Sequence, residues 1–179
     1  MLRHCFRVLL VSVMLLWTAP PVSAQTDATA ENCEKLIDEV IMNARLKLGC
    51  PYEWGATGPN RYDCSGLVNY AFRQVGVVVT RTTSTLCIEG ERVFLTNIKR
   101  GDLIFFVSGE YPNRNISHVG IALTDYDNGD FKFIHASAGN GCVVVSHFTD
   151  SNYQKTYGGA RRIISCECRL EVMTSQASA

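Results

Sequence analysis

The sequence predicts an α+β fold in which N-terminal helices pack on an antiparallel β-sheet. Apolar residues recur at three- and four-residue spacing in two early segments, 31–48 and 64–76, which is the pattern of an amphipathic helix. From residue 102 onward, short apolar runs alternate with turn-forming segments rich in glycine, asparagine and aspartate. Short turns join strands that run antiparallel, so the second half of the chain is expected to form one such sheet.

The first helix is predicted over residues 31–48, and Gly49 is expected to stop it. Its apolar face consists of Leu36, Ile37, Val40, Ile41, Ala44 and Leu48. The segment 49–60 is rich in glycine and proline and therefore predicts an ordered loop.

The second helix is predicted to begin at Cys64 and to end at Gly76, with Asp63 capping its free amides. Gly66 leaves room in the first turn for another backbone or a substrate to come close. The apolar face of this helix consists of Leu67, Val68, Ala71, Phe72 and Val75. Residues 77–79 are interpreted as a short extended piece, and the stretch from there to Arg100 as a polar loop without a clear period.

The remaining chain predicts the strands of the sheet. They are expected at residues 102–107, 118–123, 131–136, 142–146 and 159–168, the last of them closing the sheet. Asp127-Asn128-Gly129 and Gly139-Asn140-Gly141 supply two of the turns between these strands.

Residues 1–24 have the pattern of a secretory signal peptide. Arg3 and Arg7 form a basic start, residues 8–17 are almost entirely apolar, and Val22-Ser23-Ala24 resembles a small-residue cleavage site. The apolar run is too short to span a bilayer, although a retained membrane anchor is the competing interpretation. We therefore expect an exported protein, in the periplasm or in the extracellular space and cell wall. Residues 25–179 then form a single domain with its core at about 45–165, after a flexible leader at 25–30.

The charge of the chain indicates no nucleic-acid partner. The sequence has 17 basic and 17 acidic residues, without a basic run or patch. Neither an integral membrane segment after signal cleavage nor a particular oligomeric state is indicated.

The cysteines fit an exported protein. Cys5 leaves with the signal segment, and seven remain: Cys33, Cys50, Cys64, Cys87, Cys142, Cys166 and Cys168. An odd number predicts one free thiol and up to three disulfides, whose connectivity the sequence leaves open. Zinc binding is the alternative, but Cys166 and Cys168 have no partner pair at metal-ligand spacing, so we expect neither a metal nor another cofactor.

Cys64 is the candidate nucleophile. A thiol in the first turn of a helix lies at the positive end of the peptide dipoles, which favours the reactive thiolate. A disulfide would abolish this chemistry, so Cys64 is expected to be the unpaired cysteine. A cysteine nucleophile also needs a base to take its proton and a third group to orient that base.

Two of the histidines are suited to these two functions. Side chains alternate along a strand, so His118 shares a small-residue face with Gly120, and His135 shares a face with Phe133. On adjacent antiparallel strands the two imidazoles can come within hydrogen-bond reach, one as base and the other as its orienting group. His147 lies in a polar stretch and is interpreted as a surface residue.

Six blocks of the chain closely resemble the NlpC/P60 family of cysteine peptidases. They are Gly49–Gly55, Asp63–Val68, Arg100–Phe106, Ser117–Ile121, Phe133–Ser137 and Gly159–Arg162, in this order. The resemblance implies a papain-like α+β fold in circularly permuted order. It also implies an endopeptidase that acts on the stem peptides of peptidoglycan, typically at the bond between a γ-D-glutamyl residue and a diamino acid.

The resemblance also implies functions for individual residues. Cys64 matches the nucleophile, His118 the general base and His135 the polar third member. A thiolate at the cysteine and an imidazolium at His118 are expected to form the reactive pair. Tyr52 matches a tyrosine beside the nucleophile whose hydroxyl helps to hold the oxyanion. Asp63 and Ser65 match positions that line the substrate groove, where a carboxylate can receive a free stem-peptide amine.

Several alternatives remain open at this level. Tyr52 can be a core residue, and Asp63 can be a helix cap only. One of the loop cysteines Cys50, Cys87 and Cys142 could pair with the nucleophile as a redox lock. The same fold could also serve as a non-catalytic module that binds wall peptides, or as a thiol amidase or acyltransferase. The bond that is cut and the diamino acid that is accepted are not specified by the sequence.

Overall fold

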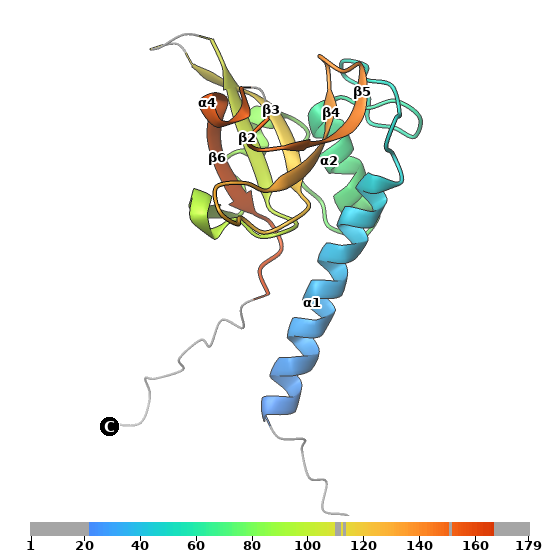
Figure 1. Ribbon diagram of the computed structural model, residues 1–179. Coiled ribbons are helices and arrows are strands. Elements are labelled where there is room, and N and C mark those ends of the chain that lie inside the picture. The colour runs from blue at the N-terminus through green and yellow to red at the C-terminus, as the bar shows by residue number, and fades with distance from the viewer. Residues whose placement is uncertain (1–21, 110–111, 113, 151, 167–179) are drawn as a thin grey trace, which may run out of the picture.

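The computed structural model of this protein describes residues 22–109, 112, 114–150 and 152–166. It has the predicted α+β architecture, with two main helices on one side of an antiparallel six-stranded sheet (Figure 1). The strand order is β1-β6-β2-β3-β4-β5. Strands β2 to β5 are therefore neighbours in the order of the chain, and the last strand, β6, lies between β1 and β2. The fold class predicted from the sequence is confirmed.

The first helix is longer than predicted at its start and shorter at its end. Helix α1 spans Val22–Arg45, so residues 25–30 are helical rather than a flexible leader. No glycine or proline interrupts this stretch, and its alanines favour a helix. Tighter turns follow Arg45, and Leu48 is 48% exposed instead of lying on the buried face. Residues 1–21 of the predicted signal peptide lie outside the described residues.

Helix α2 (Cys64–Arg73) confirms the predicted start and the predicted cap. Leu67, Val68, Ala71 and Phe72 are buried as expected, whereas Val75 is only partly buried beyond the helix end. Gly66 has the close neighbour that its lack of a side chain suggested. A Cβ atom at this position would lie 2.1 Å from the carbonyl oxygen of Ala56, so only glycine lets the 49–60 loop pack against the helix.

Four predicted strands are present with small shifts of their ends, and the fifth is shorter than predicted. The observed strands are β2 (Leu103–Ser108), β3 (Asn115–Ala122), β4 (Lys132–Ser137), β5 (Cys142–His147) and β6 (Tyr157–Arg162). The prediction that this strand continues to residue 168 was wrong. Strand β6 ends at Arg162, because this residue pairs with Glu91, the first residue of β1, and β1 offers no further partner. A short helix α4 (Tyr153–Thr156) precedes β6.

The stretch 80–100 is more structured than the sequence indicated. It contains a one-turn helix α3 (Thr83–Leu86), an edge strand β1 (Glu91–Val93) and a 3₁₀ turn η1 (Leu95–Asn97). Elements this short have no measurable hydrophobic period, so the stretch was predicted to be a loop. Tertiary contacts hold them in place, including the pairing of β1 with β6.

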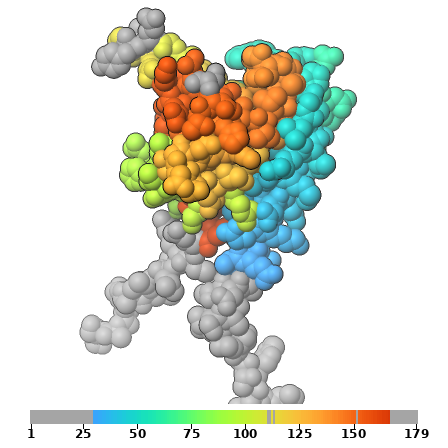
Figure 2. Space-filling model, in the orientation of Figure 1, coloured from blue at the N-terminus to red at the C-terminus, as the bar shows by residue number. Residues whose placement is uncertain are grey.

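The sheet carries an apolar cluster on each face. The helix-side cluster joins α1 and α2 to the sheet and includes Val40, Ala44, Leu67, Phe72, Phe105, Val119 and Ile121. The opposite cluster includes Ile104, Phe106, Ala122, Phe131, Phe133 and Phe148. Figure 2 shows α1 and the loop after it, in blue to cyan, running down one side of the molecule against the orange surface of β4 and β5. The loop is fixed there by an isolated bridge between Pro51 and Cys142.

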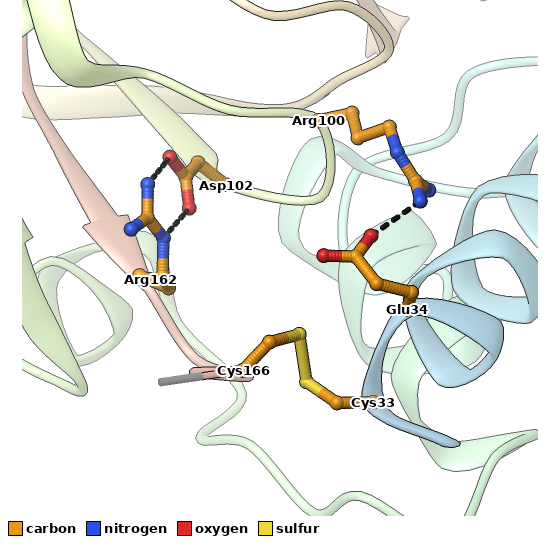
Figure 3. Close-up of a disulfide and its surroundings, with 6 residues drawn as sticks. All are labelled: Cys33, Glu34, Arg100, Asp102, Arg162 and Cys166. Carbon is orange, nitrogen blue, oxygen red and sulfur yellow. Dashed lines mark hydrogen bonds and ion pairs between the residues drawn. A yellow bond between two sulfur atoms is a disulfide. The ribbon is translucent and has the colours of Figure 1, made fainter. Parts of the chain in front are cut away.

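A disulfide joins helix α1 to the segment that follows β6. Cys33 of α1 is bonded to Cys166, which follows β6, across 133 residues of sequence. Figure 3 shows two ion pairs nearby, one between Arg100 and Glu34 and one between Asp102 and Arg162. The second of these is buried at Asp102, which is 1% exposed.

The other cysteines that the structure describes are free thiols. Cys50, Cys64, Cys87 and Cys142 are unpaired, so one disulfide is found there instead of the predicted maximum of three, and Cys168 lies outside the described residues. The Cys50 carbonyl accepts from the amide of Val143, one register step from Cys142. Adjacent positions on extended chains point to opposite sides, which keeps the two thiols apart.

The described part of the chain contains neither a metal-binding cluster nor a membrane-spanning helix. No group of three or more histidine, cysteine, aspartate or glutamate side chains there is arranged to hold a metal ion. Nor does any helix among these residues have the length and apolarity that crossing a membrane requires.

Candidate active site

The candidate nucleophile sits at the start of a capped helix. Cys64 is the first residue of α2, and the carboxylate of Asp63 accepts a hydrogen bond from the amide of Gly66 at 2.6 Å. The thiol is a free, buried group, 6% exposed, and its Sγ lies 3.7 Å from the hydroxyl oxygen of Thr83. The redox lock considered from the sequence is therefore not formed in this structure.

Cys64 opens into a cavity of about 560 Å³, which we call the main cavity. Its lining comes from four segments: Trp54 and Gly55 from the first loop, Asp63, Cys64 and Ser65 from the helix start, Arg81 to Ser84, and Ile116 and Ser117 from β3. The cavity thus lies between the thiol and the part of β3 that leads into His118. Trp54, which is 85% exposed, forms part of its outer wall.

The two candidate histidines form a pair. The Nε2 atom of His118 lies 2.7 Å from the Nδ1 atom of His135, as the alternation of side chains on β3 and β4 predicted. His135 is held in turn by the hydroxyl of Ser146 at 3.1 Å and by that of Tyr153 at 3.4 Å, both at Nε2. These contacts leave Nδ1 as the ring nitrogen of His118 that is free to face a thiol. His147 lies away from this group and pairs with Asp130 at 2.7 Å.

Burial keeps both imidazoles of this pair uncharged at neutral pH. It lowers the pKa of His118 to about 4, because the charged ring would lose its hydration. Burial also lowers the pKa of His135, to about 3, with a further contribution from repulsion by His118. A neutral imidazole carries one N–H and one free lone pair, so one ring of the pair donates and the other accepts.

The structure does not join Cys64 to His118 by a hydrogen bond, although it describes both residues. Both residues lie near the main cavity. Its lining includes Cys64 and also Ile116 and Ser117, the two residues that precede His118 on β3. Contacts between a nucleophile and its base are often long without a substrate and shorten when one binds. The catalytic functions of Cys64, His118 and His135 remain predictions.

Asp63 and Ser65 line the main cavity as predicted, but both are engaged by Arg81. The guanidinium of Arg81 donates to both carboxylate oxygens of Asp63, at 3.1 and 2.6 Å, and to the Ser65 hydroxyl at 2.8 Å. The Gly55 amide donates to the same carboxylate at 2.9 Å. A free amine of a substrate would therefore compete with Arg81 for this acceptor. The substrate-binding functions of Asp63 and Ser65 stay predictions.

Tyr52 is a packing residue in this structure, and its function at the oxyanion stays a prediction. Its ring packs against the helix-side cluster, and its side chain is partly buried. Burial raises the pKa of the Tyr52 hydroxyl, and the nearby Cys64 and Asp63 raise it further. The hydroxyl is therefore protonated beside the thiol, in the state that can donate a hydrogen bond.

Arg81 and Thr83 are the residues of this site that sequence reasoning missed. Arg81 gave no signal because its partner Asp63 is distant in sequence. A weak signal did exist for Thr83, since Thr82 precedes a short polar run and is a favourable N-cap residue. In the structure the Thr82 side chain accepts from the amide of Thr85 and fixes the turn that presents Thr83 to the thiol.

The chain is similar to a known protein family over the segments that carry this site. The model of the NlpC/P60 family matches residues 49–162. A probable endopeptidase of Corynebacterium glutamicum is 40% identical over 103 residues, which cover 58% of this chain and 44% of that protein. The gamma-DL-glutamyl hydrolase of Bacillus subtilis is 26% identical over 175 residues, which cover 95% of this chain and 40% of that protein. The chain thus spans less than half the length of both curated relatives.

Solved structures give the same fold. The peptidoglycan hydrolase RipB of Mycobacterium tuberculosis superposes with a TM-score of 0.60 at 26% identity, over 83% of this chain and 87% of that one.

Proposed function

This chain belongs to the NlpC/P60 family, and from that premise we propose that it is a cysteine endopeptidase that hydrolyses peptidoglycan stem peptides. The observation that supports this most is the neutral His118–His135 pair beside a cavity that contains a capped helix start and its free thiol. The relatives named as endopeptidases and as a gamma-DL-glutamyl hydrolase support the substrate class. We further propose cleavage between a γ-D-glutamyl residue and a diamino acid.

The reaction begins with attack by Cys64. Its Sγ forms a bond to the amide carbonyl carbon, while the thiol proton passes to Nδ1 of His118. The sequence favoured a resting thiolate with an imidazolium, but burial disfavours charge on His118, so proton transfer accompanies the attack. In this proposal, backbone amides at the start of α2 and the hydroxyl of Tyr52 stabilise the oxyanion.

The second half of the reaction releases both products. The imidazolium of His118 gives its proton to the amine as the carbon–nitrogen bond breaks, and the amine-side fragment leaves. Water then attacks the thioester with His118 as base, which frees the carboxylic acid and restores the thiol. His135 orients His118 throughout through the 2.7 Å hydrogen bond.

We propose that the protein acts outside the cytoplasm, in the periplasm or at the cell wall. The Cys33–Cys166 disulfide is of the kind that persists in oxidising compartments. The predicted signal peptide agrees with this location.

Mass analysis of reaction products tests the proposed function. The purified protein is incubated with defined stem peptides under mildly reducing conditions, and the fragments are weighed. We expect two fragments that result from addition of water at the γ-D-glutamyl–diamino acid bond. Fragments from another bond would correct the specificity, and products joined to an added amine would indicate an acyltransferase. Binding without any cleavage would instead support a non-catalytic module.

The pH profile tests the assignment of His118 as base. Only the neutral imidazole accepts a proton, so kcat/KM is expected to fall on the acid side with an apparent pKa of about 4. At pH 5.5 activity should remain close to its maximum, whereas an ordinary histidine with a pKa of about 6.5 would leave only about a tenth. The measurement is kcat/KM at constant ionic strength, with circular dichroism at each pH to show that the protein is folded. An acid limb at pH 6.5 in folded protein would contradict the assignment.

A further inference from the structure

A second cavity adjoins the main cavity. It has a volume of about 210 Å³ and lies beside α3, on the helix side of the sheet. Its lining consists of Cys87, Arg92, Phe105, Ile116 and residues 158–161. Ile116 belongs to the lining of both cavities, so a ligand that fills the main cavity can continue past this side chain into the second one.

The second cavity holds two positive charges without a negative one. Arg92 on β1 and Arg161 on β6 are directly opposite each other in the strand register, so they project from the same face. Among the described residues neither guanidinium takes part in an ion pair, and none of the lining residues is acidic. Arg81 and Arg162 differ in this respect, since each is paired with an aspartate.

The two guanidinium groups are held by contacts that leave donors available. The Nε atom of Arg161 donates to the Cys87 carbonyl at 2.7 Å, which leaves its two terminal nitrogens for another acceptor. Arg92 lies over the ring of Phe94 at 6.0 Å and is exposed. Like charges that face each other across two strands destabilise a sheet, and an anion between them would remove this cost. A planar carboxylate is an anion that the guanidinium fork can bind through two parallel hydrogen bonds.

We propose that Arg92 and Arg161 bind the C-terminal carboxylate of the substrate, on the amine side of the bond that is cut. This inference rests on the proposed function, because it assumes that a stem peptide fills the main cavity and continues into the second one. The leaving amine receives its proton from His118, so the amine side of the substrate lies toward β3. Ile116 is two residues before His118 on this strand and leads into the second cavity. Any fragment on that side of a peptide bond ends in a carboxylate, provided that the terminus is free.

This site would make the protein selective for stem peptides with a free C-terminus. A terminus blocked by an amide, or by a cross-link to another peptide, brings no negative charge into the second cavity. The preferred substrates are then short peptides that are not cross-linked at that end.

A pair of peptides that differ only at the C-terminus tests the proposal. Stem peptides that end in a carboxylate or in a carboxamide are compared by kcat/KM. For wild type, kcat/KM is expected to be about tenfold higher with the carboxylate peptide than with the carboxamide peptide. This factor corresponds to the contribution of one hydrogen bond between charged groups. In Arg92→Gln the carboxylate peptide should lose most of its advantage over the amide, with Arg161 still present, and the amide should be unchanged. Arg92 is chosen because Arg161 also supports α3 through Cys87.

Arg73→Gln is the matched control. Arg73 is an exposed arginine at the end of α2 that lines neither cavity, so its loss changes the net charge equally but should leave the preference intact. Equal rates on both peptides in wild type would overturn the proposal, as would an equal loss on both in Arg92→Gln.

Binding separates this proposal from the proposed function. If wild type cleaves neither peptide, the endopeptidase assignment fails, and calorimetric titration of the same two peptides decides about the carboxylate site. Tighter binding of the carboxylate form to wild type, but not to Arg92→Gln, would support the site. Equal binding of the two forms, or no binding of either, would overturn it.

Discussion

Replacing Cys64 by alanine is expected to reduce the hydrolysis of stem peptides to the background rate, a loss of about 10⁴-fold or more. The reason is that Cys64 supplies the one thiol among the residues that line the main cavity, and the proposed reaction passes through an acyl intermediate on its sulfur. The measurement is the single-turnover rate on a defined stem peptide, followed by mass analysis.

The fold should survive this substitution. Cys64 is a free thiol, 6% exposed, so alanine removes only the contact of its sulfur with Thr83. Cys64→Ala should therefore still bind the peptide, which calorimetry can show. Cys142→Ser is the control, because it changes a second free cysteine, which is partly buried and lines neither cavity, and it should keep full activity. Undiminished cleavage by Cys64→Ala would refute the assignment of the nucleophile.

Removing the disulfide is expected to lower the free energy of unfolding by about 2–4 kcal/mol. The variant is the double substitution Cys33→Ser and Cys166→Ser, which leaves no new unpaired thiol. The bond encloses 133 residues of sequence separation, so it removes much of the conformational freedom of the unfolded chain. The ion pairs of Arg100 with Glu34 and Asp38 cannot replace it, because they are exposed and such pairs contribute little.

Urea unfolding of oxidised and reduced protein provides the measurement. The wild-type midpoint should fall on reduction to that of the double variant, which should not respond to reductant. Cys87→Ser is the control, since this thiol only donates to the carbonyl of Ser84 and its loss should leave the response to reductant unchanged. Identical midpoints of oxidised and reduced wild type would show that the bond does not stabilise the fold.

The parts of the fold that the sequence predicted are those with local patterns. The face of α2 is visible as a three- and four-residue period, and its start is marked by the capping residue Asp63. The approach of His118 to His135 followed from the two-residue alternation of strands, because it needed only that the two strands be neighbours. Each of these predictions uses residues that lie close together in sequence or on one regular element.

The parts that the sequence did not predict depend on contacts between distant segments. The short strand β1 exists because β6 supplies its partners. Arg81 acquires its position in the site from a carboxylate on another element. The pairing of Cys33 with Cys166 could not be chosen among the possible connectivities, since it depends on how α1 lies relative to the end of β6. Contacts between distant segments leave no periodic pattern in the sequence from which they could be predicted.

The position of the disulfide has a mechanical consequence. The bond between Cys33 and Cys166 is shown in Figure 3. The six strands that the structure describes and the helices α2, α3 and α4 lie between these two residues in the sequence. Tension applied to the two ends of the chain would therefore pass through the covalent sulfur bridge and bypass the sheet. The fold between the two cysteines, with the main cavity in it, would then carry little of the applied force.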